Sequence, residues 1–224
     1  MMPGYRTDNA IDTKITGGGT ASIPRPRRTV RLRQRPAPKS GARVPDHAIL
    51  GEELGLTGSG RFHRVLDPVD GTRPILCRLP VWGTLIGMTA DGRAELRMMS
   101  QPFARERFWA DRNGAWIDHD GVRRVLATRD FGSLDRATQH TTSPEYLGKD
   151  LAHGFARLEA AVRMTHRCAE CQAIAIMAAG RIDLAIEPRF SRRASWHWIP
   201  TIERAGGVVV TRLDGMRARK ASRC

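Results

Sequence analysis

The chain has 224 residues, 41% hydrophobic and 6% aromatic, which suits one domain of ordinary size with a proper core. Its longest apolar run, CQAIAIMAAG, is far shorter than the roughly 20 residues of a membrane-spanning helix. We therefore expect no membrane span, and the first residues do not predict a secretory signal. Four cysteines make a poor disulfide framework, so we expect a reduced, cytoplasmic setting.

The net charge of +14 is concentrated at the two ends of the chain. Residues 1–44 hold ten Lys and Arg against two Asp, and residues 212–224 hold five against one, which leaves only +2 for the centre. The sequence thus predicts a basic, non-globular Arg/Pro/Gly-rich arm over 1–44, a domain over 45–214 and a basic tail over 215–224. Nucleic acid is disfavoured as a partner, although an arm that binds an acidic surface stays an alternative.

The first half of the domain has the pattern of strands. HRVLDPVDG is predicted to be a strand that ends in an acidic turn. VWGTLIGMTADGRAELRMMSQP predicts two strands joined at ADGR, which is a hairpin signal. ERFWADRNGAWIDHDGVRRVLAT continues as short strands that are broken at RNG and HDG.

Helices and strands alternate in the second half. EYLGKDLAHGFARLEAAVRM has helical spacing, and ECQAIAIMAAGRI predicts a buried helix that ends near Gly180. IDLAIEP predicts a strand, IPTIERAGG a helix with a glycine stop, and VVVTRLDG a further strand. Strands clustered early and alternating elements later predict a layered α/β or α+β domain.

Acidic side chains gather at two of the predicted strand ends. Glu52 and Glu53 follow the apolar AIL, and Asp67 and Asp70 end another strand just before Thr72. If these ends lie side by side, the carboxylates repel one another unless a cation compensates, which indicates a divalent metal site. Oxygen ligands suit Mg²⁺, Mn²⁺ or Ca²⁺ rather than Zn²⁺. A surface turn with N-cap aspartates is the alternative.

The turn between the two aspartates carries a second candidate function. Proline at position 68 fixes the local backbone, and Val69 can offer its carbonyl inward. If a helix begins at Gly71 and Thr72, their backbone N–H groups are free to bind a phosphate. One short segment thus combines candidate metal ligands with a candidate phosphate site.

Several motifs follow the order and spacing of the inositol monophosphatase family: GEELG, VLDPVDGTR, LPVWGTLIG, QPFARERFWAD, TTSP, AAGRIDLAIE and IPTIERAGGVVV. The Asp-Pro-Val-Asp-Gly-Thr block resembles that family's signature, and Arg73 with LPVWGTLI and TTSP is most similar to its histidinol-phosphatase branch. The resemblance covers about residues 45–214. It implies an α-β-α-β-α sandwich, incomplete at both ends, and Mg²⁺-dependent hydrolysis of a small phosphate monoester, with histidinol phosphate the leading substrate.

The resemblance also implies roles for single residues. The implied metal ligands are Glu52, Asp67, the carbonyl of Val69, and Asp70. Thr72, with Glu52 or Glu53, would orient the attacking water, and the amides of Gly71 and Thr72 would hold the phosphate. Metals at this site would activate that water and neutralise charge on the leaving oxygen.

Three residues are implied as substrate contacts. Glu187 in DLAIEP matches a family contact to a substrate hydroxyl or amine, and Arg73 would face the ester group. Ala169 and Glu170 replace the family's Gly-Asp pair, so the acidic function is kept one methylene further out. Cys168 and Cys171 form a single C-x-x-C, for which we expect a role in a core helix rather than zinc binding.

The chain departs from the family at the second metal. Ala194 stands where the family has an aspartate that serves this metal, and the arginines before it oppose a cation. A local shift of reading frame would explain this change and the basic ends, and so would genuine divergence. The alternatives are therefore an inositol-phosphate or other sugar-phosphate monoesterase, or a catalytically dead remnant, and a homodimer is left open.

Overall fold

The structure is a computed structural model, and it describes residues 11–14, 23–26, 44, 46–51, 55–91, 93–187 and 192–210. Side chains are described from residue 44 onward, except for 192–197. Within residues 1–44 the described part holds β1 (Ile11–Lys14) and β2 (Ile23–Pro26), which pair in antiparallel fashion. The remainder of the predicted arm and the whole predicted tail lie outside the described residues.

A large sheet of eight strands is the base of the described domain, in the order β10-β9-β8-β7-β6-β5-β3-β4. The strands are β3 (Ala48–Gly51), β4 (Gly55–Thr57), β5 (Phe62–Asp70), β6 (Gly83–Ala90), β7 (Arg93–Gln101), β8 (Glu106–Asp111), β9 (Gly114–His119) and β10 (Val122–Val125). Pairing is antiparallel except between β3 and β5, which run parallel. The predicted turns at ADGR, RNG and HDG are confirmed, because they join β6–β7, β8–β9 and β9–β10.

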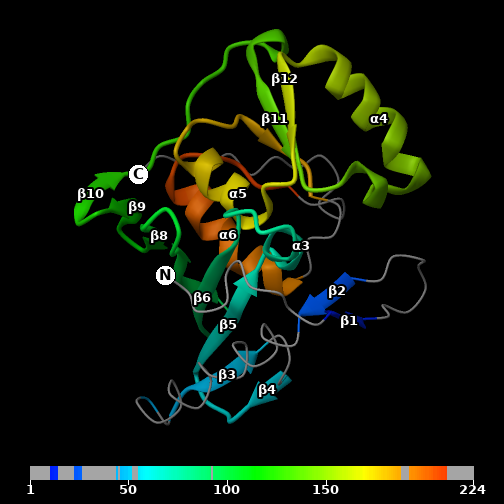
Figure 1. The fold of residues 1–224 in the computed structure, drawn as a ribbon. Coiled ribbons are helices and arrows are strands. Elements are labelled where there is room, and N and C mark those ends of the chain that lie inside the picture. Colours follow the sequence, from blue (N-terminus) through cyan, green and yellow to red (C-terminus); the bar gives the residue numbers. More distant parts are fainter. Residues whose placement is uncertain are drawn as a thin grey trace.

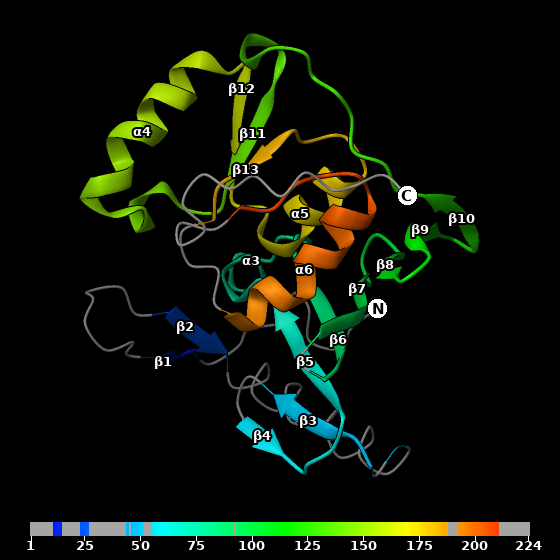
Figure 2. The same ribbon diagram turned by 180° about the vertical axis from the view of Figure 1, so that it is seen from behind.

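A small parallel sheet and the helices complete the layers. The sheet order is β12-β11-β13, with β11 (Thr138–Thr141), β12 (Met164–Arg167) and β13 (Leu184–Ala185). The helices are α3 (Thr72–Leu76), α4 (Gly148–Ala161), α5 (Glu170–Ala178) and α6 (Arg192–Arg204), with 3₁₀ turns η1 (Leu134–Arg136) and η2 (Pro144–Tyr146). Helices α5 and α6 lie between the two sheets, while α4 flanks the small sheet away from them (Figures 1 and 2). The predicted layered α/β fold is confirmed, with four layers in the described residues.

The core lies between the large sheet and the pair α5–α6. Helix α5 is apolar on all sides, as expected of a helix buried between two layers. Its small residues let it approach its neighbours closely, and Trp198 and Ile202 of α6 fill the space beside it. The sheet contributes inward-facing residues from several strands: Leu85, Met99, Phe108, Ala110 and Ala115. No helix in the described part of the chain is long and apolar enough to cross a membrane.

Two element predictions differ from the structure. Helix α6 begins at Arg192, well before the predicted start at IPTIERAGG, so RRASWHW supplies its first turns. Residues 208–210, expected to start a final strand, are not part of a strand, and Val208 and Val210 are exposed. A strand needs a hydrogen-bonded neighbour, and a run of apolar residues alone does not supply one.

Candidate active site

An irregularity in β5 brings Asp67 and Asp70 to the same face of the large sheet. Residues three apart on a regular strand point to opposite faces, because side chains alternate with period two. Here Asp67 pairs with Leu85 and Asp70 with Gly83, so three steps on β5 match two on β6. This β-bulge holds one extra residue and restores both aspartates to the face that Leu85 shares with α5.

The bulge is held by two local hydrogen bonds. The backbone N–H of Val69 donates to Oδ1 of Asp67 at 3.1 Å, and the hydroxyl of Thr84 donates to the carbonyl of Pro68 at 2.8 Å. Proline at this position has no N–H to leave unpaired, which suits it to a disrupted ladder. The predicted strand end is thus a bulge inside a strand that continues through Asp70.

Cys171 of α5 faces the two aspartates. Its thiol is buried and donates a hydrogen bond to the carboxylate of Asp70. Burial raises the pKa of this thiol well above its usual value, and the charges of Asp70, Asp67 and Glu170 raise it further. The predicted core role is confirmed for Cys171, whereas Cys168 is exposed and lies before the helix. Sequence reasoning missed the contact to Asp70, because nothing in the spacing links the two segments.

Glu170 opens α5 and adds a third carboxyl group to the same region. Burial, together with the charges of Asp70 and Glu187, raises its pKa to about 7, and Arg73 partly offsets these effects. Burial is the largest cause of this shift, and the charges of the neighbouring carboxylates add to it. The structure therefore brings Asp67, Asp70, Glu170 and Glu187 into one electrostatic neighbourhood.

Gly71 makes the sharp turn that separates the bulge from α3. Its φ of 94° lies in the left-handed region, and a Cβ there would stand 3.0 Å from Cα and Cβ of Trp82 and from the carbonyl of Val81. Only glycine fits both the conformation and the space. The turn starts α3 at Thr72, whose first-turn N–H groups have no acceptor inside the helix.

Arg73 is held over the site by the segment that follows β11. Its Nη1 donates to the hydroxyl of Ser143 at 3.4 Å, and its guanidinium lies 5.0 Å from the ring centre of Tyr146. The Ser143 hydroxyl in turn donates to Glu145 at 2.6 Å. A cation over an aromatic face and beside a hydroxyl is oriented but keeps donors for a ligand.

Glu187 lies just beyond the end of β13 and is fixed by Thr142. The backbone N–H of Thr142 donates to Oε1 of Glu187 at 2.8 Å, and the hydroxyl of Thr142 donates to the same oxygen at 3.0 Å. The parallel pairing of β11 with β13 brings the two residues together. The TTSP motif thus anchors Arg73 and Glu187, two of the three predicted substrate contacts, a role that the sequence did not reveal.

The predicted ligands Glu52 and Glu53 lie outside the described residues. Strand β3 ends at Gly51, which pairs with Leu66, one residue before Asp67. Ala194 lies in the first turn of α6, whose backbone alone is described there. Among described side chains, no three His, Cys, Asp or Glu residues are arranged to hold a metal ion. The two aspartates would need a ligand from outside this set.

The sequence matches the inositol monophosphatase family over residues 37–220. It is 34% identical over 169 residues to the bifunctional phosphatase IMPL2 of Arabidopsis thaliana, covering 74% of this chain and 48% of that protein. It is 30% identical over 179 residues to the histidinol-phosphatase of Mycobacterium tuberculosis, covering 77% of this chain and 67% of the relative. The chain thus spans about half the length of the plant relative and two thirds of the mycobacterial one.

Solved structures share the fold. An inositol monophosphatase from Zymomonas mobilis superposes with a TM-score of 0.72 at 26% identity, covering 90% of this chain and 76% of that one. The extragenic suppressor protein SuhB from Bartonella henselae gives a TM-score of 0.76 at 20% identity, covering 89% and 77%. Sequence and structure comparisons therefore point to the same group of proteins.

Proposed function

Because the chain belongs to the inositol monophosphatase family, whose members are phosphatases, we propose that it hydrolyses a small phosphate monoester and that histidinol phosphate is this substrate. The similarity to histidinol-phosphatases supports the choice of substrate. The observation that carries the proposal is the bulge in β5, which turns Asp67 and Asp70 toward the same face. We further propose that the reaction serves histidine biosynthesis in the cytoplasm.

The carboxyl groups of the site fit Mg²⁺. Asp70 and Glu187 raise the pKa of the buried Glu170 by charge repulsion, in addition to the effect of burial, and a divalent cation would relieve this repulsion. The donors are oxygens, and oxygens are the ligands that Mg²⁺ prefers. Asp67, Asp70 and the carbonyl of Val69 would hold the ion, together with Glu52. A bound Mg²⁺ would supply Lewis-acid activation of the attacking water and would neutralise charge on the leaving oxygen.

The chain's own residues perform the remaining tasks. The amides of Gly71 and Thr72 bind the phosphate, and the hydroxyl of Thr72, with Glu52 or Glu53, orients the attacking water. Arg73, whose guanidinium lies over the ring of Tyr146, faces the ester group. These groups act by holding phosphate and water in line, since positioning and charge stabilisation are the main contributions a protein makes to phosphoryl transfer.

The carboxyl groups of Glu187 and Glu170 recognise the substrate. Glu187, fixed by Thr142, binds the amine or a hydroxyl of the substrate, and Glu170 adds a second acidic contact. An ammonium group beside these carboxylates is favoured by charge over a neutral hydroxyl. This preference is what selects histidinol phosphate over a polyol phosphate.

The proposed site lacks one ligand for a second metal ion. Ala194 offers no ligand where the family has an aspartate, so we propose that a second Mg²⁺ binds poorly and that turnover is reduced. The described part of α6 contains no acidic side chain near this position, because Glu203 lies in its last turn.

The test is phosphate release from histidinol phosphate and from inositol 1-phosphate, each with Mg²⁺ and with a chelator. We expect Mg²⁺-dependent release that is faster from histidinol phosphate. Faster release from inositol 1-phosphate would mean that the reaction is the proposed one but that the preferred substrate is an inositol phosphate. No release from either substrate by a protein with a folded circular-dichroism spectrum would identify a catalytically dead remnant and reject the proposal.

A further inference from the structure

His140 occupies the centre of the small sheet, where it is fully buried. It lies on the middle strand β11 and pairs in register with His166 on β12 and with Ala185 on β13. Glu187 is two residues beyond Ala185, so alternation places it on the same side. The topology thus lines up exposed His166 on β12, buried His140 on β11 and Glu187 just beyond β13.

The contact between the two histidines restricts where their protons are. Nδ1 of His140 lies 3.3 Å from Nδ1 of His166, and the rings stack with centroids 5.5 Å apart. Two facing nitrogens make a hydrogen bond only if one carries a proton and the other does not. Desolvation lowers the pKa of His166, and the neighbouring His140 ring lowers it further, which favours an uncharged His166 at this contact.

The other nitrogen of His140 decides which ring donates. Its Nε2 lies 3.4 Å from Oε1 of Glu187, within ion-pair distance, but it makes no hydrogen bond to any described residue. A buried nitrogen lone pair facing a carboxylate would be repelled, whereas an N–H there is attracted. His140 therefore carries its proton on Nε2, accepts at Nδ1, and receives the Nδ1–H of His166.

We propose that His140 is a positioning residue for Glu187, and that His166 sets its tautomer so that the Nε2–H always faces the carboxylate. Two hydrogen bonds from Thr142 then reach Oε1 of Glu187, and the Nε2–H of His140 adds an electrostatic contact to the same oxygen at 3.4 Å. Oε2 makes no hydrogen bond to a described residue and is left for the substrate. This inference rests on the proposed function for its substrate, an amine-bearing phosphate monoester.

This arrangement affects which substrate Glu187 binds best. With Oε1 held by these contacts, the carboxyl group of Glu187 is fixed in one orientation, and Oε2 stays available to the ligand. An ammonium group gains most from such an acceptor, because a charge-assisted hydrogen bond is stronger than a neutral one. The pair of histidines thus acts on substrate choice without contacting the substrate.

Two amide variants separate the two nitrogens of His140. His140→Gln keeps an N–H donor near the Nε2 position, while His140→Asn reaches only the Nδ1 position and removes the donor to Glu187. We expect the KM for histidinol phosphate to rise about tenfold in His140→Asn and less than about threefold in His140→Gln, with kcat changed less than about threefold in both. An analogue of histidinol phosphate without the amino group should show no such difference.

His153→Gln is the matched control, because His153 is exposed on α4. It should leave both constants unchanged. Equal KM values in the two His140 variants would overturn the positioning role, and so would a fall in kcat at constant KM, which indicates a purely structural defect.

A second measurement needs neither turnover nor a variant. In the ¹⁵N spectrum of the histidine rings of the wild-type protein, we expect His140 protonated on Nε2 and His166 on Nδ1. The opposite pair of tautomers would overturn the inference, even in an active enzyme. The stated tautomers in a protein that hydrolyses no monoester would sustain the positioning of Glu187 and reject only the proposed function.

Discussion

Asp67 and Asp70 show how one extra residue determines what a pair of side chains can do. Their spacing of three would divide them between the faces of a regular strand, and the bulge reunites them. Asp70 then accepts a hydrogen bond from Cys171 of α5, and the charges of both aspartates act on that thiol. Asp67 also holds the bulge, because its Oδ1 accepts the Val69 N–H.

Asp67→Asn should lower phosphate release by more than about 100-fold, because loss of even an outer partner of a metal costs about 10–100-fold. The amide can still accept the Val69 N–H, so the fold should persist. Asp135→Asn, an exposed aspartate in η1, is the control and should keep full activity. Near-normal turnover of Asp67→Asn would remove this residue from the catalytic site.

Gly71→Ala should lower the free energy of unfolding by about 2 kcal/mol or more, since it combines left-handed strain with a Cβ that meets the Trp82 backbone at 3.0 Å. Gly121 has a φ of 80° and nothing within 4 Å of the place that a Cβ would take, so Gly121→Ala carries the strain alone, about 1 kcal/mol. Urea denaturation of both variants compares the two. Equal losses would mean that Trp82 moves aside at no cost.

The residues of the site differ in how far the sequence predicts them. The Asp-Pro-Val-Asp-Gly-Thr block predicts its own acidic turn, because all of its members are adjacent in the chain. Thr142, His140 and Cys171 come to the site by strand register and helix packing, which link segments about 70 to 100 residues from that block. Such contacts depend on tertiary structure, and local patterns contain no signal for them.

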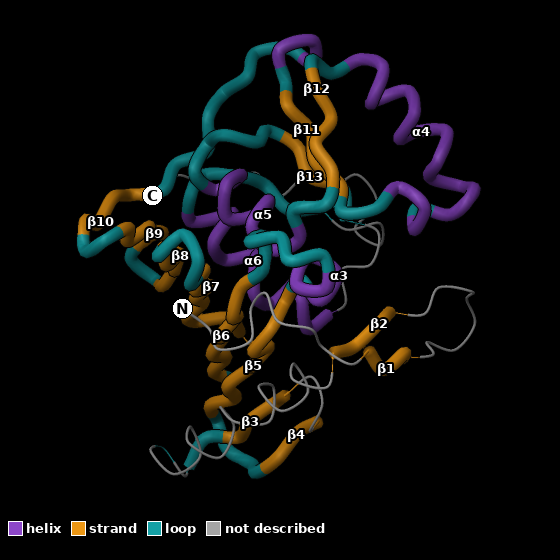
Figure 3. The backbone as a smooth tube through the Cα atoms, viewed as in Figure 1, coloured by secondary structure: helices purple, strands orange, loops and turns teal. Residues whose placement is uncertain are grey.

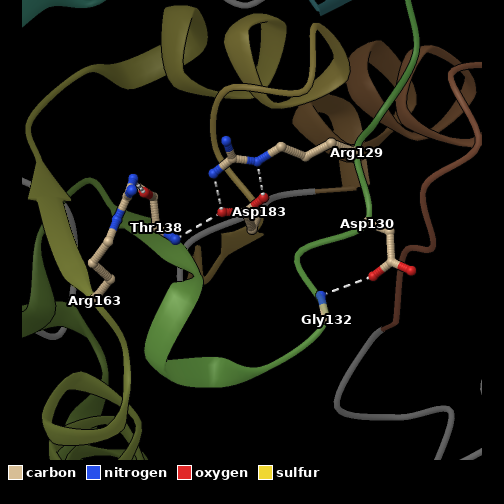
Figure 4. A network of polar contacts seen from close by, with 6 residues as sticks. All are labelled: Arg129, Asp130, Gly132, Thr138, Arg163 and Asp183. Atoms are coloured by element: carbon tan, nitrogen blue, oxygen red, sulfur yellow. Dashed lines mark hydrogen bonds and ion pairs between the residues drawn. The ribbon is translucent and has the colours of Figure 1, made fainter.

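At the scale of elements, the buried carboxylate of Asp183 links the small sheet to the connection between β10 and β11. Asp183 accepts two hydrogen bonds from Arg129 at 2.7 Å each and one from the Thr138 N–H at 2.7 Å (Figure 4). Arg129 lies on the long connection between β10 and β11, drawn as a loop in Figure 3. Arg163 adds a bond to the Thr138 hydroxyl, so one network fixes the start of both β11 and β13.

Asp183→Asn should lower the free energy of unfolding by about 1–3 kcal/mol at pH 7, since it removes a charged acceptor whose side chain is fully buried. The hydrogen bond from Arg129 lowers the pKa of Asp183 below its usual value of 3.8. Its stabilisation is therefore complete above about pH 4 and is lost as the pH falls through the lowered pKa. The difference between wild type and variant should shrink toward about pH 2 in denaturant titrations.

The neighbouring Asp130 supplies the control for this network. Asp130 is exposed, and among the described residues it accepts only the Gly132 N–H, so Asp130→Asn should cost less than about 0.5 kcal/mol at any pH. A difference between Asp183→Asn and wild type that stays constant over the whole acid titration would contradict the role of the Arg129 pair.

The sequence predicts the elements unevenly, and for identifiable reasons. The hairpins of the large sheet follow from ADGR, RNG and HDG, which are local turn signals. Helix α5 follows from an apolar run closed by Gly180, whose φ is 71°. The start of α6 escapes prediction because only Ala194 and Trp198 of RRASWHW extend the apolar spacing that leads to Ile202, among arginines and polar residues.

For the whole molecule, metal binding should be visible as stability. An ion that binds only the folded state at about 100 times its dissociation constant adds about 2.7 kcal/mol to the free energy of unfolding. Mg²⁺ should thus raise the melting temperature, against a control of NaCl at equal ionic strength, which matters for a chain of net charge +14. Asp67→Asn should abolish the rise.

Ala194→Asp should shift the same Mg²⁺ titration to lower concentrations and raise turnover, because it restores a carboxylate where the family has one. An unchanged titration would mean that the site lacks more than this one ligand. The stability readout is independent of the substrate, so it tests metal binding even if histidinol phosphate is not hydrolysed.

The bulge in β5 also restricts how the gene can change length. Inserting one codon between Asp67 and Asp70 would turn Asp70 to the opposite face of the sheet, or force a second unpaired residue into the strand. Deleting one codon would keep both aspartates on one face, but it would remove either the N–H that holds Asp67 or the carbonyl that accepts the Thr84 hydroxyl. We therefore expect that sequences of related proteins lack insertions and deletions in this short stretch and carry them in the hairpin loops between β7 and β10.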